Sequence, residues 1–213
     1  MAETDPAAAP PAVTGIILAG GRSTRMGRDK ASLDLAGRTL LQRTVTVLAA
    51  AVDEIVLVHA PGQSLPPVDA ACPVRLAADP TEGEGPLVGM ATGLEAARAP
   101  IAIVVGVDMP FLQPDLLRLL AAGVADGARW VLPIEQGRPQ PLCSAFARNA
   151  LPVLRAHIEA GDRAPMTVAT DLGMTRLEED AWRAADPDGL SFIDVDTPED
   201  FAAALVQLEE REW

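Results

Sequence analysis

Short apolar runs alternate along the chain with longer segments in which apolar residues recur every three or four positions. The run at 101–107 is apolar at every position except its glycine, which is typical of a strand covered on both faces. The segment at 39–51 has the helical spacing of Leu and Val instead. This pattern predicts strands at 14–20, 54–60, 74–79, 101–107, 129–135, 141–147 and 192–196, and helices at 39–51, 86–99, 113–123, 149–161 and 198–212.

The alternation of strands and helices predicts an α/β protein with a three-layer α/β/α, Rossmann-like arrangement and a mostly parallel sheet. Ligands of such sheets bind at the carboxyl ends of the strands. The sequence shows no internal repeat and no second core. We therefore expect one domain over residues 14–213, preceded by a disordered Ala/Pro-rich leader at 1–13.

Composition narrows the class of function. The formal net charge of -13 argues against a nucleic-acid partner, which requires a broad basic surface. No apolar run approaches the roughly 20 residues needed to span a bilayer, and the first residues lack the basic start of a signal peptide. Cys72 and Cys143 stand apart without metal-ligand spacing. We expect a cytoplasmic protein with neither a membrane nor a nucleic-acid partner.

A glycine-rich, basic loop at 18–30, LAGGRSTRMGRDK, directly follows the first predicted strand. Its glycines allow the backbone to turn tightly and to present N–H groups to a phosphate. The spacing matches neither a Walker loop nor a dinucleotide fingerprint, so a dehydrogenase is disfavoured. A solvated basic turn is the alternative to a triphosphate site. The loop contains Gly20, Gly21, Gly27, Arg22, Arg25, Arg28 and Lys30.

Acidic residues follow two of the predicted strands. Asp108 follows the apolar run at 101–107, where a carboxylate is able to hold Mg²⁺ beside substrate phosphates. The alternative to metal binding is an aspartate that begins a turn. Asp194 and Asp196 alternate in the predicted strand FIDVD and would share one face of it. They are either a second pair near the ligand or, for Asp196 or Thr197, the N-cap before Pro198.

Asp79 is the candidate for base recognition. A carboxylate accepts both hydrogen bonds from the N1–H and N2–H₂ edge of guanine, whereas cytosine has no such pair of donors. The alternative is an Asp-Pro turn. Arg138 and Arg163 are candidates for an acceptor phosphate or ordinary surface arginines. His59 and His157 have no evident partner and are assigned structural roles.

In order along the chain, LAGGRSTRMGRDK, the Asp79 segment, GPL, VDMPFL, the QPL segment and DVDTPED resemble the molybdenum cofactor guanylyltransferase family. The resemblance runs from Gly15 to Phe201 and implies a fold of the nucleotide-diphospho-sugar transferase type. It implies that Leu18, Ala19, Gly20 and Lys30 contact GTP, that Asp79 contacts the guanine and that Asp108 binds Mg²⁺. On this basis Gly20, Gly21 and Arg25 are assigned to the β and γ phosphates and Lys30 to the α-phosphate.

The implied reaction transfers GMP from GTP to the phosphate of molybdopterin or Mo-molybdopterin, with pyrophosphate as the leaving group. The resemblance also implies transient contact with other cofactor-biosynthesis proteins or apo-molybdoenzymes. Two departures bear on the base and the acceptor. After the second predicted strand the family often has an asparagine near the nucleotide, and Val58, His59 and Ala60 occupy that stretch here. Asp194 and Asp196 replace an N-x-N pattern. Use of CTP or another acceptor, and a non-catalytic nucleotide-binding module, are the alternatives.

Overall fold

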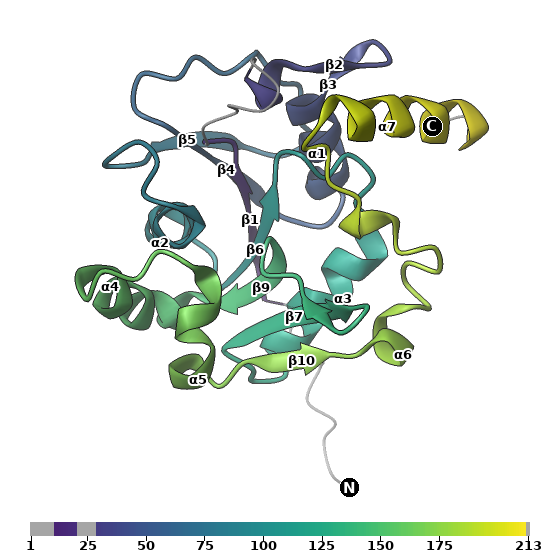
Figure 1. The fold of residues 1–213 in the computed structure, drawn as a ribbon. Coiled ribbons are helices and arrows are strands. Elements are labelled where there is room, and N and C mark those ends of the chain that lie inside the picture. The colour runs from purple at the N-terminus through teal and green to yellow at the C-terminus, as the bar shows by residue number, and fades with distance from the viewer. Residues whose placement is uncertain (1–10, 21–28, 212–213) are drawn as a thin grey trace, which may run out of the picture.

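The computed structural model describes residues 11–20 and 29–211 (Figure 1). Within them, the main sheet has the strand order β10-β7-β9-β6-β1-β4-β5, with β8 paired to β7, and β2 and β3 form a separate hairpin. The strands are β1 Val13–Leu18, β2 Asp34–Leu35, β3 Arg38–Thr39, β4 Glu54–His59, β5 Val74–Ala78, β6 Ile101–Gly106, β7 Trp130–Glu135, β8 Arg138–Pro139, β9 Cys143–Ala147 and β10 Thr175–Leu177.

Helices connect most of these strands and cover the sheet. Threonine and proline begin several of them: Thr39 accepts a hydrogen bond from the Gln42 N–H as the N-cap of α1, and Pro86 occupies the first turn of α2. A short 3₁₀ turn, η1, spans Lys30–Ser32. The α-helices are α1 Leu40–Ala49, α2 Pro86–Ala96, α3 Pro114–Ala125, α4 Leu151–Glu159, α5 Ala169–Leu172, α6 Glu179–Trp182 and α7 Pro198–Arg211. None of the helices in these residues is long and apolar enough to cross a membrane.

The strand order determines where a ligand can bind. Strands β1, β4, β5 and β6 are mutually parallel, and β6 lies on the opposite side of β1 from β4. The connections leaving β1 and β6 therefore diverge, and in sheets of this kind the crevice that binds a ligand lies at the carboxyl ends of the two strands at such a point. Strand β9 is antiparallel to both β6 and β7. The predicted α/β/α arrangement with a mostly parallel sheet is confirmed.

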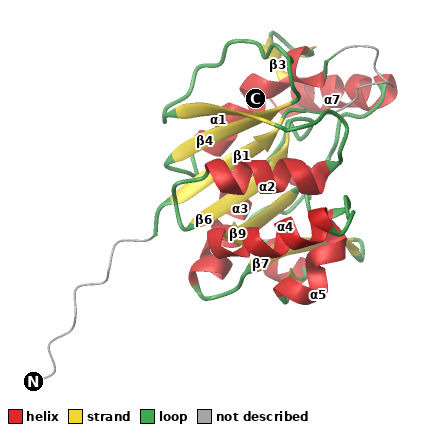
Figure 2. Ribbon diagram, turned by 90° about the vertical axis from the view of Figure 1, so that its left-hand side faces the viewer, coloured by secondary structure: helices red, strands yellow, loops and turns green. Residues whose placement is uncertain are grey.

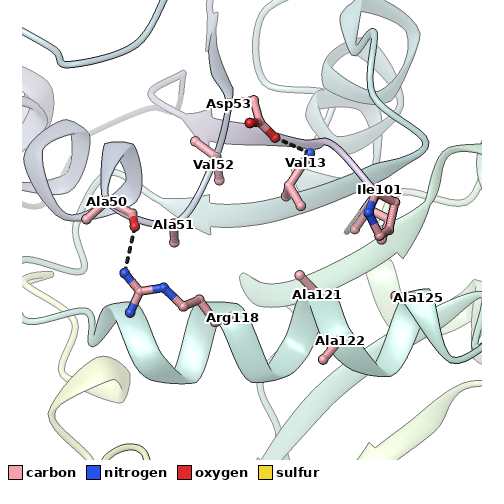
Figure 3. A pocket seen from close by; sticks show the side chains of 11 residues that line it. Val13, Ala50, Ala51, Val52, Asp53, Ile101, Arg118, Ala121, Ala122 and Ala125 are labelled. Atoms are coloured by element: carbon pink, nitrogen blue, oxygen red, sulfur yellow. Dashed lines mark hydrogen bonds between the residues drawn. The ribbon is translucent and has the colours of Figure 1, made fainter. Parts of the chain in front are cut away.

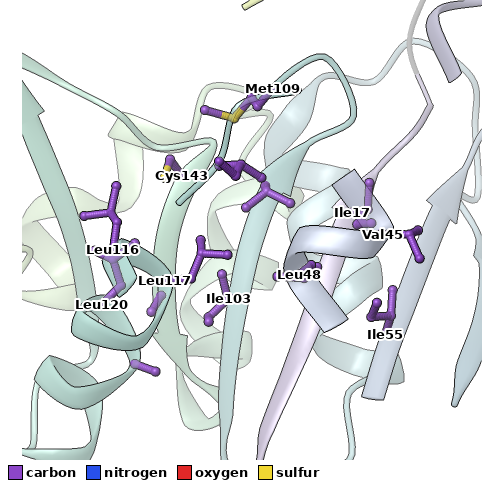
Figure 4. Close-up of a cluster of buried hydrophobic side chains, with 14 of the residues drawn as sticks. Ile17, Val45, Leu48, Ile55, Ile103, Met109, Leu116, Leu117, Leu120 and Cys143 are labelled. Carbon is purple, nitrogen blue, oxygen red and sulfur yellow. The ribbon is translucent and has the colours of Figure 1, made fainter. Parts of the chain in front are cut away.

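The core has one layer on each face of the sheet. Consecutive residues of β1 point to opposite faces, so Ile17 packs in the layer under α1 and α3, and Ile16 packs under α2 and α4. Figure 2 shows α2, α4 and α5 over one face. Figure 4 shows the other layer, where Leu48 of α1 and Leu117 of α3 face the strands. Strand β6 is buried along its whole length, as its sequence predicts.

A third apolar cluster joins the C-terminal helix to the β2–β3 hairpin. Leu35 and Phe111 are fully buried in it, and Ala204 of α7 is 1% exposed. Figure 1 shows α7 beside the hairpin, at the end of the sheet where β1 and β6 finish. This packing brings the segment before α7 over the carboxyl ends of the strands.

Three sequence predictions about elements need correction. Helix α3 continues past Gly123 to Ala125, because Gly123 lies against Val131 inside the packed helix and the chain turns at Gly127, where φ is +108°. Residues 192–196 are not a strand: Phe192 ends a 3₁₀ turn over Leu190–Phe192, and Val195 makes a single bond to the sheet end, from its N–H to the Asp108 carbonyl. Strand β1 begins at Val13, inside the predicted leader, whose residues 1–10 lie outside the described part of the chain.

A buried carboxylate at the amino end of the sheet leads to a pH prediction. Glu54 is 9% exposed and accepts hydrogen bonds from Thr14 Oγ1 (2.8 Å), Arg75 Nη2 (2.9 Å) and the Arg98 N–H (3.0 Å). Burial alone would raise the pKa of Glu54, but these donors outweigh it and lower the pKa. Because the folded-state pKa is depressed, the stabilisation is present above the ordinary carboxyl range and is lost as the pH falls through the folded-state value.

Glu54→Gln is therefore expected to lower the free energy of unfolding by about 1–3 kcal/mol at neutral pH, with a smaller difference from the parent in acid. Denaturant titrations at a series of pH values measure this effect. Glu95→Gln is the matched control, since Glu95 forms an exposed pair with Arg155. A stability difference that stayed constant down to the acid transition would contradict the prediction.

Candidate functional site

Three segments that are distant in sequence converge at the carboxyl end of β6. Asp108 follows that strand, Lys30 begins η1 after the glycine-rich loop, and Asp196 precedes α7. The Val195 N–H donates to the Asp108 carbonyl (2.9 Å), and the Val107 N–H donates to the Leu18 carbonyl at the end of β1 (3.2 Å). Backbone hydrogen bonds thus join the Asp196 segment to the Asp108 segment, and the end of β6 to the end of β1.

The Lys30 ammonium lies between two carboxylates. Its Nζ donates to Asp108 Oδ2 (2.8 Å) and to Asp196 Oδ1. Burial alone would lower the pKa of Lys30, but the hydrogen bonds and charges of Asp108 and Asp196 raise it above its ordinary value. Gly106 leaves room for the Asp108 carboxylate, since a Cβ at Gly106 would lie 2.4 Å from Asp108 Oδ1. Lys30 is therefore charged at neutral pH and poised beside an acidic pair.

The structure distinguishes the alternatives for the acidic residues before α7. Thr197 takes the capping role, because its Oγ1 accepts from the Asp200 N–H (3.1 Å) and Asp200 accepts in return from the Thr197 N–H (2.9 Å). Asp196 instead faces Lys30. The pKa of Asp194 is raised to about 7 by loss of hydration within the crowded segment and by the negative charges of Asp108 and Asp196. Negative charge is thus concentrated around Lys30.

The start of the glycine-rich loop is attached to strand β4. The N–H groups of Ala19 (2.8 Å) and Gly20 (3.2 Å) both donate to the Val58 carbonyl. A Cβ at Gly20 would lie only 3.0 Å from the backbone nitrogen of Ala60, so a glycine allows this close approach. The predicted phosphate contacts Gly21 and Arg25 lie outside the described residues. Ala19 and Gly20 follow the carboxyl end of β1, and their contact with the nucleotide stays a prediction.

A second group of residues forms at the start of α2. A Cβ at Gly89 would lie 3.3 Å from Leu18 Cδ2 and 3.6 Å from Asp79 Oδ2, so these two predicted residues meet over that glycine. Asp79 Oδ1 is shielded from water and accepts no hydrogen bond within residues 11–20 and 29–211. Burial raises the pKa of Asp79, against the lowering effects of Thr92 and His59. A buried acceptor in this state would be satisfied by a ligand donor.

Two further sequence predictions change in the structure, and a third stays untested. Arg163 is engaged by Glu84 Oε2 (2.6 Å) and by the Ile158 carbonyl (3.0 Å), which argues against a free phosphate-binding arginine. His157 does have partners, because its ring nitrogens contact Asp162 (2.7 Å) and Asp171 (3.0 Å), and these bonds raise its pKa. It thus links α4 to the following loop and α5. Arg138 in β8 is exposed, and its contact with an acceptor phosphate stays a prediction.

A hollow at the opposite end of the sheet lacks this chemistry. It is lined mainly by small apolar residues at the end of α1 and along α3, with Arg118 and Asp53 at its margin (Figure 3). Both charged groups are engaged by backbone: Arg118 Nη2 donates to the Ala50 carbonyl (2.7 Å), and Asp53 Oδ2 accepts from the Val13 N–H (2.7 Å). The carboxyl end of the sheet is therefore the candidate functional site.

A parallel α/β sheet with a glycine-rich loop, a lysine and acidic residues at its switch point defines a nucleotide-binding protein of the Rossmann-like class. Residues 15–175 match the family model of the MobA-like NTP transferase domain. The chain therefore belongs to the MobA-like NTP transferase family, a family of nucleotidyltransferases.

Individual relatives agree with this assignment. The chain is 35% identical to a probable molybdenum cofactor guanylyltransferase of Chloroflexus aggregans, over 88% of this chain and 91% of that protein. It is 33% identical to the molybdenum cofactor guanylyltransferase of Desulfosudis oleivorans, over 91% and 94% of the two chains. The crystal structure of molybdopterin-guanine dinucleotide biosynthesis protein A from Archaeoglobus fulgidus superposes with a TM-score of 0.77 at 22% identity, covering 92% of this chain and 99% of that one. This last likeness concerns the fold.

Proposed function

We propose that this protein transfers GMP from GTP to the phosphate of molybdopterin or Mo-molybdopterin and releases pyrophosphate. The observation that carries the proposal is the Lys30 ammonium held between Asp108 and Asp196 at the crevice where the glycine-rich loop begins and ends. The names of the two curated relatives supply the nucleotide and the cofactor. The concentration of carboxylates also suits a reaction in which phosphate charge is neutralised by cations.

The proposed reaction requires positioning more than proton transfer. An oxygen of the acceptor phosphate attacks the α-phosphorus of GTP, and the bond to the β-phosphate oxygen breaks with pyrophosphate as the leaving group. A phosphate monoester is already ionised at neutral pH, so the attacking oxygen needs no general base. Lys30 would stabilise the charge that develops on the α-phosphate, and the loop amides at Ala19 and Gly20 would orient the nucleotide.

The residues at the site fit a magnesium ion. Mg²⁺ is usually held by one or two carboxylates together with water and substrate phosphates. Asp108 and Asp196 converge on one cation, the Lys30 ammonium, so a divalent cation between them is chemically reasonable. Among the described residues no group of three His, Cys, Asp or Glu side chains is placed to hold a metal ion, so the proposed shell depends on substrate phosphates and water. When bound, the ion would neutralise the triphosphate, and Asp108 and Asp196 would release the Lys30 ammonium toward the α-phosphate.

The experiment that tests this proposal measures pyrophosphate release from the purified protein with Mg²⁺. Release is expected only when GTP and molybdopterin are both present. GTP binding without pyrophosphate release under these conditions would support a non-catalytic nucleotide-binding module instead.

Asp79 is expected to determine the choice of base. Its shielded Oδ1 lacks a hydrogen-bond partner among the described residues, and guanine offers two adjacent donors that a carboxylate can accept. The parent should therefore prefer GTP over CTP and ATP by roughly tenfold to a few hundredfold, as expected when a buried acceptor is left unpaired by the wrong base. Asp79→Ala should reduce this preference, chiefly by impairing the use of GTP.

The measurement is kcat/KM for each nucleotide in the parent and the variant. Asp115→Ala serves as a control because Asp115 lies exposed on α3 and pairs with Arg118. If Asp79→Ala kept the full preference for GTP, backbone groups between Gly85 and Gly89 would have to recognise the base. If the parent used CTP as well as GTP, the guanylyl assignment itself would be wrong.

A further inference from the structure

The side-chain amide of Gln63 connects both ends of the glycine-rich loop to the end of strand β4. Its Nε2 donates to the Ala19 carbonyl (3.0 Å) near the start of the loop and to the two carboxylate oxygens of Asp29 (3.1 and 3.2 Å) near its end. Its Oε1 accepts from the Ala60 N–H (2.9 Å). One partly buried amide thus contacts three segments that surround the proposed phosphate site.

Gln63 is itself placed by a tight turn. Pro61 and Gly62 occupy the middle of that turn, φ of Gly62 is +73°, and the Gln63 N–H donates to the Ala60 carbonyl (3.1 Å). Proline followed by a glycine with positive φ is the pattern of a type II turn. The Oε1 contact to Ala60 closes the same turn. The amide is therefore fixed relative to β4 before it reaches the loop.

The Asp29 carboxylate transmits this position to Lys30. Asp29 is the N-cap of η1, and its Oδ1 accepts from the Ala31 N–H (3.1 Å) while its carboxylate accepts from Gln63. Lys30, the first residue of η1, lies between Asp29 and Ala31 in the sequence. Any shift of Asp29 would move the Lys30 backbone and the reach of its ammonium toward Asp108.

We propose that Gln63 is a positioning residue, which holds the ends of the nucleotide loop at a fixed separation and places Lys30 for catalysis. This role rests on the proposed transfer reaction wherever it is tested by an activity measurement. It assigns to the turn after β4 a part in catalysis that does not require contact with substrate. The donor groups on Nε2 carry this role, whereas Oε1 serves the local turn.

Because Nε2 and Oε1 have different roles, one substitution removes the first role and keeps the second. Gln63→Glu keeps an oxygen for the Ala60 N–H but loses the Nε2 donor and faces the Asp29 carboxylate with a like charge. We expect kcat to fall by roughly 10-fold to 100-fold, as for a small displacement of a catalytic group. Gln63→Met, which removes both contacts without adding charge, should also lower kcat. Circular dichroism and thermal unfolding verify that each variant folds.

Gln42 provides a matched control. Gln42 lies on α1, and its amide contacts the loop between β4 and β5, which also contains Gln63. Its Nε2 donates to the Asp69 carbonyl (2.8 Å), and its Oε1 accepts from the Asp69 N–H (2.8 Å). Gln42→Glu therefore makes the same chemical change away from Lys30, and kcat should stay within about twofold of the parent. Full activity of Gln63→Glu, or equal losses in both variants, would overturn the proposal.

A double-mutant cycle separates positioning from general stability. If Gln63 acts through Lys30, Gln63→Glu should reduce kcat by less than about twofold in a Lys30→Ala background, because the group that it positions is already gone. A loss as large as in the parent background would mean that Gln63 acts independently of Lys30 and would contradict the inference.

A second measurement does not require activity. Lys30 is the only lysine of the chain, so protein labelled with ¹³C at the lysine ε-carbon gives one NMR signal. Gln63→Glu should shift this signal and Gln42→Glu should leave it in place. An inactive parent would defeat the proposed transfer reaction, while the NMR comparison would still decide the positioning role. An unchanged Lys30 signal in Gln63→Glu would overturn the positioning role of Gln63.

Discussion

Asp108→Asn is expected to reduce the rate of nucleotidyl transfer by about 10³-fold or more while the protein stays folded. Asparagine has nearly the same shape but no charge, so it would neither hold a divalent cation well nor pair with the Lys30 ammonium, which lies 2.8 Å from Asp108 Oδ2. A loss of about 4 kcal/mol of transition-state stabilisation corresponds to this factor. Steady-state kinetics at saturating GTP and varied Mg²⁺ measure it.

The fold should tolerate this change because the Asp108 side chain lies at the solvent-facing end of β6 and is 20% exposed. Asp115→Asn, on the exposed surface of α3, is the matched control and should retain the parent rate. If Asp108→Asn reached the parent rate at any Mg²⁺ concentration, the carboxylate would not be required and the magnesium assignment would fail.

Lys30→Met is expected to lower kcat by about 10²–10³-fold, as for the loss of one donor to a developing oxyanion, while the dissociation constant for GTP changes only a few-fold. The charge on the α-phosphate oxygens grows in the transition state, so a cation aimed at them is more valuable there than in the ground state. Methionine preserves most of the side-chain length. Kinetics together with calorimetric titration of GTP distinguish the two effects.

Arg155→Met is a suitable control for Lys30→Met, since Arg155 is an exposed cation paired with Glu95. Lys30→Met should also free Asp108 and Asp196 from their shared partner. A variant that lost GTP affinity in proportion to its rate would show that Lys30 contributes to uniform binding and not to the transition state.

Local sequence patterns were sufficient for much of the fold and part of the site. The uninterrupted apolar run at 101–107 predicted a buried strand with Asp108 at its end, and the structure confirms both. Glycine and proline likewise indicated the loop after β1 and the start of α2. These features depend on a few consecutive residues, whose types determine the local backbone conformation.

Long-range features were not accessible in the same way. Lys30 and Asp196 are 166 residues apart, and the packing of α7 against the β2–β3 hairpin, together with the bond from the Val195 N–H to the Asp108 carbonyl, brings them together. The alternation in FIDVD suggested a strand, but Val195 forms only a single bond to the Asp108 carbonyl and no ladder. Gln63 carries no charge and lies in the loop between β4 and β5. Nothing in the neighbouring residues indicated that its side chain contacts both Ala19 and Asp29.

The proposed reaction transfers GMP from GTP to the phosphate of molybdopterin. The most direct test incubates the purified protein with molybdopterin, Mg²⁺ and each NTP separately, and determines the mass of the cofactor product. We predict that GTP gives a product heavier by one guanylyl group, with one pyrophosphate formed per product and little reaction with CTP or ATP. A cytidylyl product, or an unmodified cofactor with every nucleotide, would contradict the account.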